Sequence, residues 1–288
     1  MQSARSRSAR AETKPLTTKT AQTVQAQTLA LRVGQKPRSR CDHLACEEPL
    51  EIRVRGRSIA VTMRTPGNDD ELAAGFLLTE GIVRQRADIT GSAECLAAES
   101  PQNTLNVFLA PGVKVNFKQL TRHVFASSSC GLCGKASIDA VHQSFPPVAR
   151  TLNVSSKVLA AMPELMRAAQ KAFAQTGGLH AAGLFHRSGK LLALREDVGR
   201  HNAVDKVLGY AFLEEAIPLD SHVLLVSGRA SFEIMQKALA ARVEIVAAIS
   251  APSSLAVEFA KESGQTLVGF LRGKTMNVYC GPERIRGC

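Results

Sequence analysis

The feature that most constrains the fold is a regular alternation of strand-like and helix-like segments over residues 179–279. Short apolar runs predict strands at 179–186, 191–195, 222–227, 244–249, 266–271 and 276–279, and amphipathic runs predict helices at 200–213, 230–241 and 253–263. Strand–helix–strand order implies right-handed crossovers, with helices packed on a shared sheet. We therefore predict an α/β fold for this half of the chain, with a mixed, largely parallel sheet. A further helix is predicted at 162–175.

The first half of the chain predicts a smaller α+β layer. Apolar and polar residues alternate from Leu50 to Met63, and Arg55-Gly56-Arg57 interrupts them, which indicates a β-hairpin. Asn68, with Glu71 three residues later, resembles a capped helix start, and Gly81 ends that helix. Further strands are expected at 86–96 and 104–110. The predicted organisation is a disordered basic tail at 1–44, a small α+β domain at 45–125, a loop and short helix bearing two cysteines at 126–144, and an α/β domain at 145–288.

The net charge of +11 is concentrated in the tail. Residues 1–40 hold nine of the 36 Lys and Arg but only one of the 25 Asp and Glu, so the rest of the chain is close to neutral. This distribution argues against a nucleic-acid-binding domain. The tail is rich in Ser, Thr, Gln and Arg and poor in large apolar residues, which indicates disorder. It lacks the apolar core of a secretory signal, so an unstructured leader is the preferred interpretation and a transit peptide is the alternative.

No apolar run approaches the length of a membrane span, which is about 18 residues or more. The seven cysteines are an odd number without framework spacing, which favours free thiols in a reducing compartment.

The segment from Ser127 to Lys135 sets Cys130 and Cys133 in a run of Ser and Gly residues. A cysteine reacts as its thiolate, which C-x-x-C spacing or a nearby cation such as Lys135 favours. A structural zinc site needs four ligands, and only one such pair is present. A thioredoxin-type pair is expected near the start of a β-α-β unit, whereas this pair follows a whole α+β layer. An exposed reactive thiol, a zinc half-site and two inert cysteines all remain open at this point.

Three consecutive strand-to-helix turns carry polar or cationic residues. They are the segment 195–206, which contains Arg200 and His201, the turn Ser227-Gly228-Arg229, and the segment 250–254. Helix N-termini bind anions, and ligands of open α/β sheets bind at the carboxyl ends of the strands. A solvated helix start with ordinary charge pairs is the alternative for the first segment. Together the turns predict a site for an anionic, phosphate-bearing ligand.

The segment Gly269 to Thr275 contains a Gly-Lys-Thr run but is not a P-loop. The first glycine of that motif would fall at Val268, and a strand rather than a helix follows. A basic loop that contacts phosphate and a plain hairpin turn are equally consistent with it.

These segments together resemble the FdhD/NarQ family of sulfur-carrier proteins required for formate dehydrogenase activity. The resemblance covers about residues 45–280. It is carried by Glu48-Pro49-Leu50, Met63 to Asp69, Gly75-Phe76-Leu77 with Glu80-Gly81, Ser128 to Gly134, Thr176-Gly177-Gly178 with His180, Arg195 to Lys206, Ser227-Gly228-Arg229 and Gly269-Phe270.

The resemblance implies a cytoplasmic homodimer with a cytidine-deaminase-like α/β domain. Such a carrier takes persulfide sulfur from a cysteine desulfurase and passes it to a molybdenum or tungsten bis-molybdopterin guanine dinucleotide cofactor, which formate dehydrogenase then receives. It places the persulfide on Cys130 and a supporting role on Cys133. The cofactor contacts that it implies are Phe270, Leu271, Arg272, Gly273, Lys274 and Thr275, with Arg200, His201, Ser227, Gly228 and Arg229 nearby.

Two rival functions are consistent with such a fold. A zinc deaminase needs H-x-E followed by P-C-x-x-C, but Ala181 and Ala182 follow His180 and the cysteine pair precedes it. We therefore expect no catalytic metal. The remaining alternative is a non-catalytic cofactor-binding chaperone, in which the two thiols are structural or hold a metal.

Overall fold

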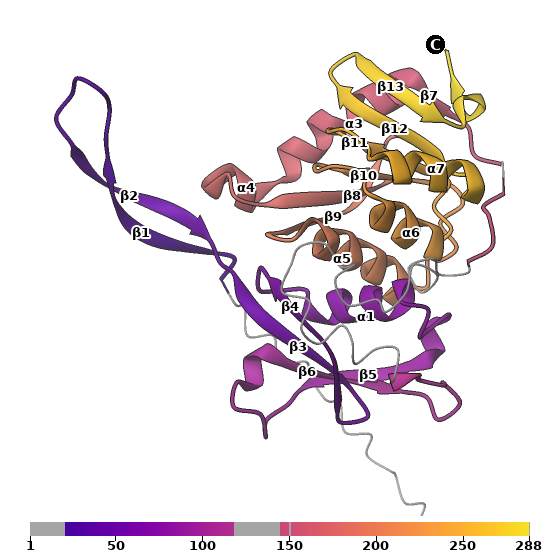
Figure 1. The fold of residues 1–288 in the computed structure, drawn as a ribbon, viewed down its shortest axis with the longest axis horizontal. Coiled ribbons are helices and arrows are strands. Elements are labelled where there is room, and N and C mark those ends of the chain that lie inside the picture. Colours follow the sequence, from indigo (N-terminus) through magenta and orange to yellow (C-terminus); the bar gives the residue numbers. More distant parts are fainter. Residues whose placement is uncertain (1–20, 118–144, 150, 288) are drawn as a thin grey trace, which may run out of the picture.

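The computed structural model describes residues 21–117, 145–149 and 151–287. Within these residues the chain forms a projecting two-stranded arm, a four-stranded sheet and a six-stranded sheet with helices on both faces (Figure 1). The short helix expected within 126–144 and both cysteines of the C-x-x-C pair lie outside the described residues.

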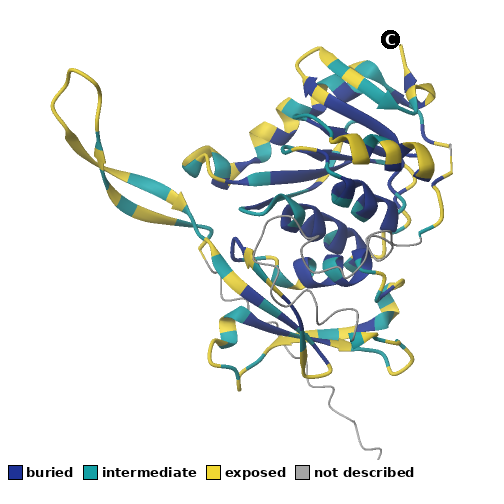
Figure 2. Ribbon diagram, in the orientation of Figure 1, coloured by how far each residue is buried: buried dark blue, intermediate teal, exposed yellow. Residues whose placement is uncertain are grey.

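The arm consists of β1 (Thr23–Ala30) and β2 (Arg38–Ala45), which pair antiparallel. It extends away from the body, and most of its surface is exposed (Figure 2). The predicted disorder of residues 1–44 is therefore wrong from Thr23 onward. The prediction of disorder relied on the polar composition of this segment. The two strands nevertheless pair, because their backbone N–H and C=O groups hydrogen-bond to each other without an apolar core.

The small sheet has the strand order β4-β3-β6-β5. The predicted hairpin is confirmed as β3 (Glu48–Val54) and β4 (Arg57–Arg64), joined through the positive φ angles of Arg55 and Gly56. The other strands are β5 (Ile89–Glu94) and β6 (Thr104–Leu109), and α1 (Asp69–Thr79) covers one face.

The start of α1 differs in detail from the predicted capping box. Asn68 adopts a left-handed conformation, and its side chain makes no capping hydrogen bond. The Asn68 carbonyl instead accepts the first helical bond from Leu72 N at 2.9 Å. Gly81, with φ 71°, ends the helix as expected.

The large sheet has the order β13-β12-β11-β10-β8-β9. Its strands are β8 (His180–His186), β9 (Leu191–Asp197), β10 (His222–Val226), β11 (Ile245–Ala248), β12 (Thr266–Arg272) and β13 (Thr275–Cys280). Only β10, β11 and β12 run parallel, and the other three strands are antiparallel to their neighbours. The predicted sheet is thus mixed but not largely parallel, because short turns join β8 to β9 and β12 to β13.

Helices cover both faces of this sheet. The predicted helices are confirmed on one face as α5 (Arg200–Leu213), α6 (Phe232–Ala240) and α7 (Ser254–Ser263), and α3 (Ser156–Ala169) packs on the other face. The helix expected at 162–175 is broken at Gln170, after which α4 (Lys171–Thr176) begins. A short parallel pair, β7 (Val154–Ser155) with β14 (Ile285–Arg286), lies beside α3. Among the described residues, no helix has the length and apolarity needed to cross a membrane.

The two layers share one core, in which α1 packs directly against α5. The helices cross at two glycines. A Cβ on Gly75 would lie 1.9 Å from the Asp205 carbonyl oxygen, and a Cβ on Gly209 would lie 1.8 Å from that of Glu71. This crossing fixes α1, and with it the small sheet, against α5, whose first residues belong to one of the predicted functional segments.

Candidate functional site

The large sheet gathers all three predicted polar turns at one edge, which we call the carboxyl edge. The strands β10, β11 and β12 end there. Antiparallel β8 begins at the same edge, because Ala182 pairs with Val226, and β9 ends there, because His180 pairs with Asp197. The edge therefore collects residues from five strand ends.

Backbone hydrogen bonds fasten the neighbouring turns to one another. Ala230 N donates to Ala251 O at 3.2 Å, and Ser253 N donates to Ala230 O at 3.0 Å. Phe270 N donates to Ser250 O at 3.1 Å, which links the next turn. The turns that follow β10 and β11 and the end of β12 thus lie side by side.

Two arginines and two histidines lie near one another at this edge, namely Arg200, Arg229, His180 and His201, and we call them the cationic cluster after the charge of the arginines. Gly228 lies next to two of them, since a Cβ built there would be in ordinary contact with His180 Nδ1 at 3.4 Å and with Arg200 Cβ at 3.7 Å. Burial lowers the pKa of His180 from its ordinary 6.5, and the charges of the other three cluster residues lower it further. His180 was quoted for the family resemblance but was not among the predicted contact residues. Its position two residues after Gly178, at a strand start, was the available signal.

His201 has a carboxylate partner. Its Nε2 lies 2.8 Å from Glu233 Oε2, with the two side chains 14% and 13% exposed, and 3.4 Å from Ser231 Oγ. Glu233 Oε1 is buried without a hydrogen-bond partner among the described residues. Glu233 was missed by the sequence reasoning because it sits in an ordinary helix start.

The remaining charged residues of the 195–206 segment hold the fold together. Asp197 and Lys206 are fully buried and pair at 2.8 Å. Asp197 also accepts from Gly199 N at 2.8 Å, Thr65 N at 3.1 Å and Asn202 Nδ2 at 3.1 Å. This network joins α5 to the end of β4 and shapes the turn that presents Arg200.

Ser227 is likewise occupied in the fold. Its Oγ accepts from Ala181 N at 2.8 Å, and its own N donates to Ala181 O at 2.9 Å. Arg229, two residues on, is exposed. Within this turn, Gly228 lies against the His180 ring and Arg229 supplies the charge.

The segment 270–275 comprises the end of β12, the turn at Gly273 and Lys274 and the first residue of β13, as the hairpin interpretation expects. Phe270 is 38% exposed and has a positive φ of 50°. Leu271 is fully buried in the core facing α3, so its side chain is turned away from the edge. Arg272 Nε donates to Ile249 O at 2.9 Å, which ties the loop to β11. The following residues, Gly273, Lys274 and Thr275, are exposed.

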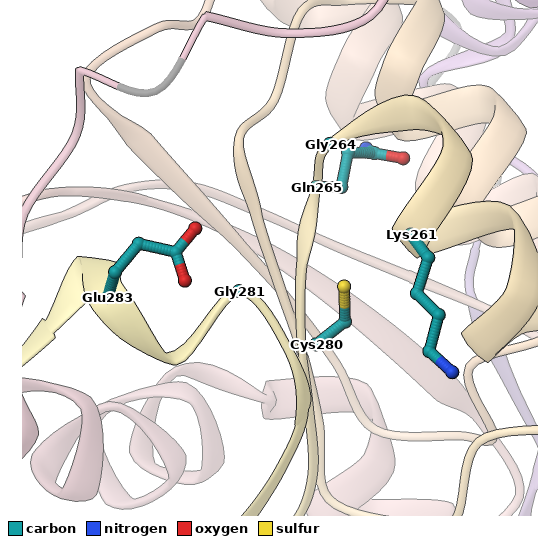
Figure 3. A pocket seen from close by; sticks show the side chains of 6 residues that line it. All are labelled: Lys261, Gly264, Gln265, Cys280, Gly281 and Glu283. Atoms are coloured by element: carbon teal, nitrogen blue, oxygen red, sulfur yellow. The ribbon is translucent and has the colours of Figure 1, made fainter.

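Two described cysteines differ in chemical character. The pKa of Cys95 is lowered, chiefly by a hydrogen bond from the Asn106 side chain. The pKa of Cys280 is raised by burial and by Glu283. Cys280 lines a cavity of about 240 Å³ at the opposite sheet edge, where Figure 3 shows it between Glu283 and Lys261. Among the described residues, no group of three or more His, Cys, Asp or Glu could hold a metal.

Comparison with known proteins identifies the family. Residues 45–286 match the model of the FdhD/NarQ family. The chain is 55% identical over 256 residues to a sulfur carrier protein FdhD of Mycobacterium tuberculosis, covering 86% of this chain and 93% of the relative. It is 52% identical over 254 residues to a sulfur carrier protein FdhD of Streptomyces coelicolor, covering 86% and 90%.

A solved structure has the same fold. The crystal structure of a formate dehydrogenase accessory protein from Desulfotalea psychrophila superposes with a TM-score of 0.76 at 27% identity, covering 92% of this chain and all of that one. The chain described here belongs to the FdhD/NarQ family.

Proposed function

We propose that this chain is a sulfur carrier of the sulfurtransferase type. Cys130 accepts persulfide sulfur from a cysteine desulfurase, Cys133 supports it, and the sulfur passes to a bis-molybdopterin guanine dinucleotide cofactor destined for formate dehydrogenase. The names of its relatives support the carrier role. Cys130 and Cys133 lie outside the described residues, so their roles rest on the C-x-x-C pattern and the resemblance. A cytoplasmic homodimer with a cytidine-deaminase-like domain is part of the same proposal.

The observation that carries the acceptor half of the proposal is the cationic cluster at the carboxyl edge. A guanine dinucleotide contains pyrophosphate, and Arg guanidinium groups pair well with phosphate oxygens. Arg200 begins α5 and Arg229 precedes α6, so both lie near helix N-termini, which favour anions. The cofactor is the substrate here, and the edge supplies positive charge for its phosphates.

The donor half is tested by intact-mass measurement. Incubation of the full chain with a cysteine desulfurase and cysteine is expected to add the mass of one sulfur atom, and Cys130→Ala is expected to abolish the addition. Cys95→Ser is the matched control, because the Cys95 thiol has a lowered pKa but lies away from the C-x-x-C pair in sequence. An unshifted wild-type mass, or an equal shift in Cys130→Ala, contradicts the assignment.

The same variant distinguishes a chaperone from a carrier. A non-catalytic cofactor chaperone predicts that Cys130→Ala still supports an active formate dehydrogenase. A carrier predicts that cells with Cys130→Ala accumulate an inactive dehydrogenase that contains the cofactor without the added sulfur. Metal analysis of the purified chain addresses a metal-holding role for the two thiols.

A further inference from the structure

His180 lies at the carboxyl edge, among the other residues of the cationic cluster. It is the first residue of β8, and its ring lies against Gly228 and beside Arg200. Hydrogen bonds between Ala181 and Ser227 hold β8 against the turn that carries Arg229. The imidazole is therefore fixed between the two arginine-bearing turns, and it is only half-buried.

Positive charges around this imidazole outweigh the negative ones. Arg200 and Arg229 have no carboxylate partner among the described residues, whereas His201 is paired with Glu233. Asp197, the nearby carboxylate on β9, is compensated by the buried Lys206. Arg200 Nε is also buried without a hydrogen-bond partner in the described part of the chain. The net effect is an excess of positive charge around His180 when no ligand is bound.

An excess of positive charge opposes protonation of a neighbouring imidazole, and a bound anion reverses this opposition. The pKa of His180 in the free protein is lowered by burial and by Arg200, His201 and Arg229, against an opposing effect of Asp197, so the ring is less readily protonated than an exposed imidazole. A phosphate group placed between the arginines would offset their charge and favour the imidazolium. By linkage, a ligand that favours the protonated ring is bound more tightly where that proton is available.

We propose that His180 is a further ligand-binding residue of the carboxyl edge, which takes up a proton when a phosphate-bearing ligand binds and then contacts the anion as an imidazolium. The inference rests on the proposed acceptor site. It adds His180 to the residues that bind the ligand, and it adds the uptake of a proton to the binding step. His201 differs from His180 in that its Nε2 already lies 2.8 Å from a carboxylate oxygen of Glu233. Binding of the cofactor's pyrophosphate is therefore expected to weaken as the pH rises.

The experiment is calorimetric titration of the full chain with GDP-mannose. This probe carries a guanine nucleotide, and its pyrophosphate is a diester with no proton to exchange near neutral pH. Heats measured in buffers of different ionisation enthalpy give the number of protons taken up. The wild type is expected to take up about one proton per site at the pH where the uptake is greatest. It is also expected to bind roughly threefold or more tightly at about pH 6 than at about pH 8.

Two variants on one strand supply the comparison. His180→Gln is expected to bind without proton uptake and with an affinity that no longer changes with pH. His186→Gln, at the far end of the same strand and at the opposite sheet edge, is expected to behave as the wild type. A circular dichroism spectrum and melting temperature for each variant establish that it is folded.

Different results overturn different claims. Binding without proton uptake by the wild type, or uptake that persists in His180→Gln, overturns the role of His180 and leaves the acceptor site standing. No binding of GDP-mannose by the folded wild type overturns the acceptor site and this inference together. The persulfide assignment is tested separately by mass and is untouched by either result.

Discussion

At the residue scale, histidines lie at both edges of the large sheet, and burial lowers the pKa of two of them. His180 lies at the carboxyl edge and His222 begins β10 at the opposite edge. Burial lowers the pKa of each, and the neighbouring His186 lowers that of His222 further. His222 Nδ1 is buried without a hydrogen-bond partner among the described residues. The Leu219 backbone and the charge of Asp220 favour the protonated ring, but they offset the lowering of its pKa only in part.

The stability of the fold is expected to depend on pH through His222. Its folded-state pKa lies below the ordinary 6.5, so the unfolded chain binds this proton more readily. The fold therefore loses stability as the pH falls below 6.5 and regains it above that value. Because half of the ring is screened by solvent, we expect a fall in melting temperature of only about 1–3 °C from this group.

Thermal unfolding of His222→Gln across the acid range measures this contribution. The variant is expected to lose less melting temperature on acidification than the wild type. His43→Gln, on the projecting arm, is the control and should follow the wild type. Parallel curves for His222→Gln and the wild type would show that the buried imidazole does not titrate as stated.

At the element scale, the crossing of α1 and α5 decides how the small sheet is attached. The backbones touch at Gly75 and Gly209, where any side chain would overlap a main-chain carbonyl. The sequence predicted both helices from their local patterns, but glycine inside a helix ordinarily counts against helix formation. Its presence is explained only by the neighbour that it admits.

Substitution of these glycines is expected to show whether helix propensity or the packing of α1 against α5 has the larger effect on stability. Gly75→Ala would gain about 1 kcal/mol of helix propensity but places a methyl group 1.9 Å from the Asp205 carbonyl oxygen. Since main chain cannot yield as a flexible side chain does, we expect a net loss of roughly 3 kcal/mol or more in the free energy of unfolding.

Denaturant unfolding provides the measurement. Gly112→Ala is the matched control, because a Cβ there meets no atom within 4 Å, and it should change stability by less than about 0.5 kcal/mol. If Gly75→Ala proved as stable as the control, close backbone contact between the two helices would be refuted.

At the scale of the whole molecule, one buried ion pair joins the two layers. Asp197 and Lys206 belong to the α/β part, but both also bond Thr65 at the end of β4, where Lys206 Nζ donates to Thr65 O at 2.7 Å. The same turn presents Arg200 to the carboxyl edge. Attachment of the small sheet and the shape of the candidate site therefore depend on the same pair.

Removal of one partner is expected to cost more than removal of both. Lys206→Met leaves the Asp197 carboxylate buried without its cation, for which we expect a loss of about 3–5 kcal/mol. The double variant Asp197→Asn with Lys206→Met should recover part of this loss, because no charge then remains buried. Equal stability of the double and single variants in denaturant unfolding would argue against this account.

The sequence by itself determined the elements whose signals are local. The β3–β4 hairpin, α5 and the alternating strands and helices after residue 179 follow from periodicity, turn glycines and short connections. It also determined the family, because the motifs stand in order along the chain. The β1–β2 arm was missed because its pairing leaves no buried apolar face, and the parallel character of the sheet was overstated because strand direction depends on connections as well as order.

Only the tertiary structure decided which residues share the candidate site. Sheet register brings His180 to the turn of Arg229, and the start of α6 brings Glu233 to His201. It also turns Leu271 into the core while Phe270 beside it is exposed. Local pattern specifies how a segment folds, but the distance between side chains far apart in the sequence is fixed only when the strands pair and the helices pack.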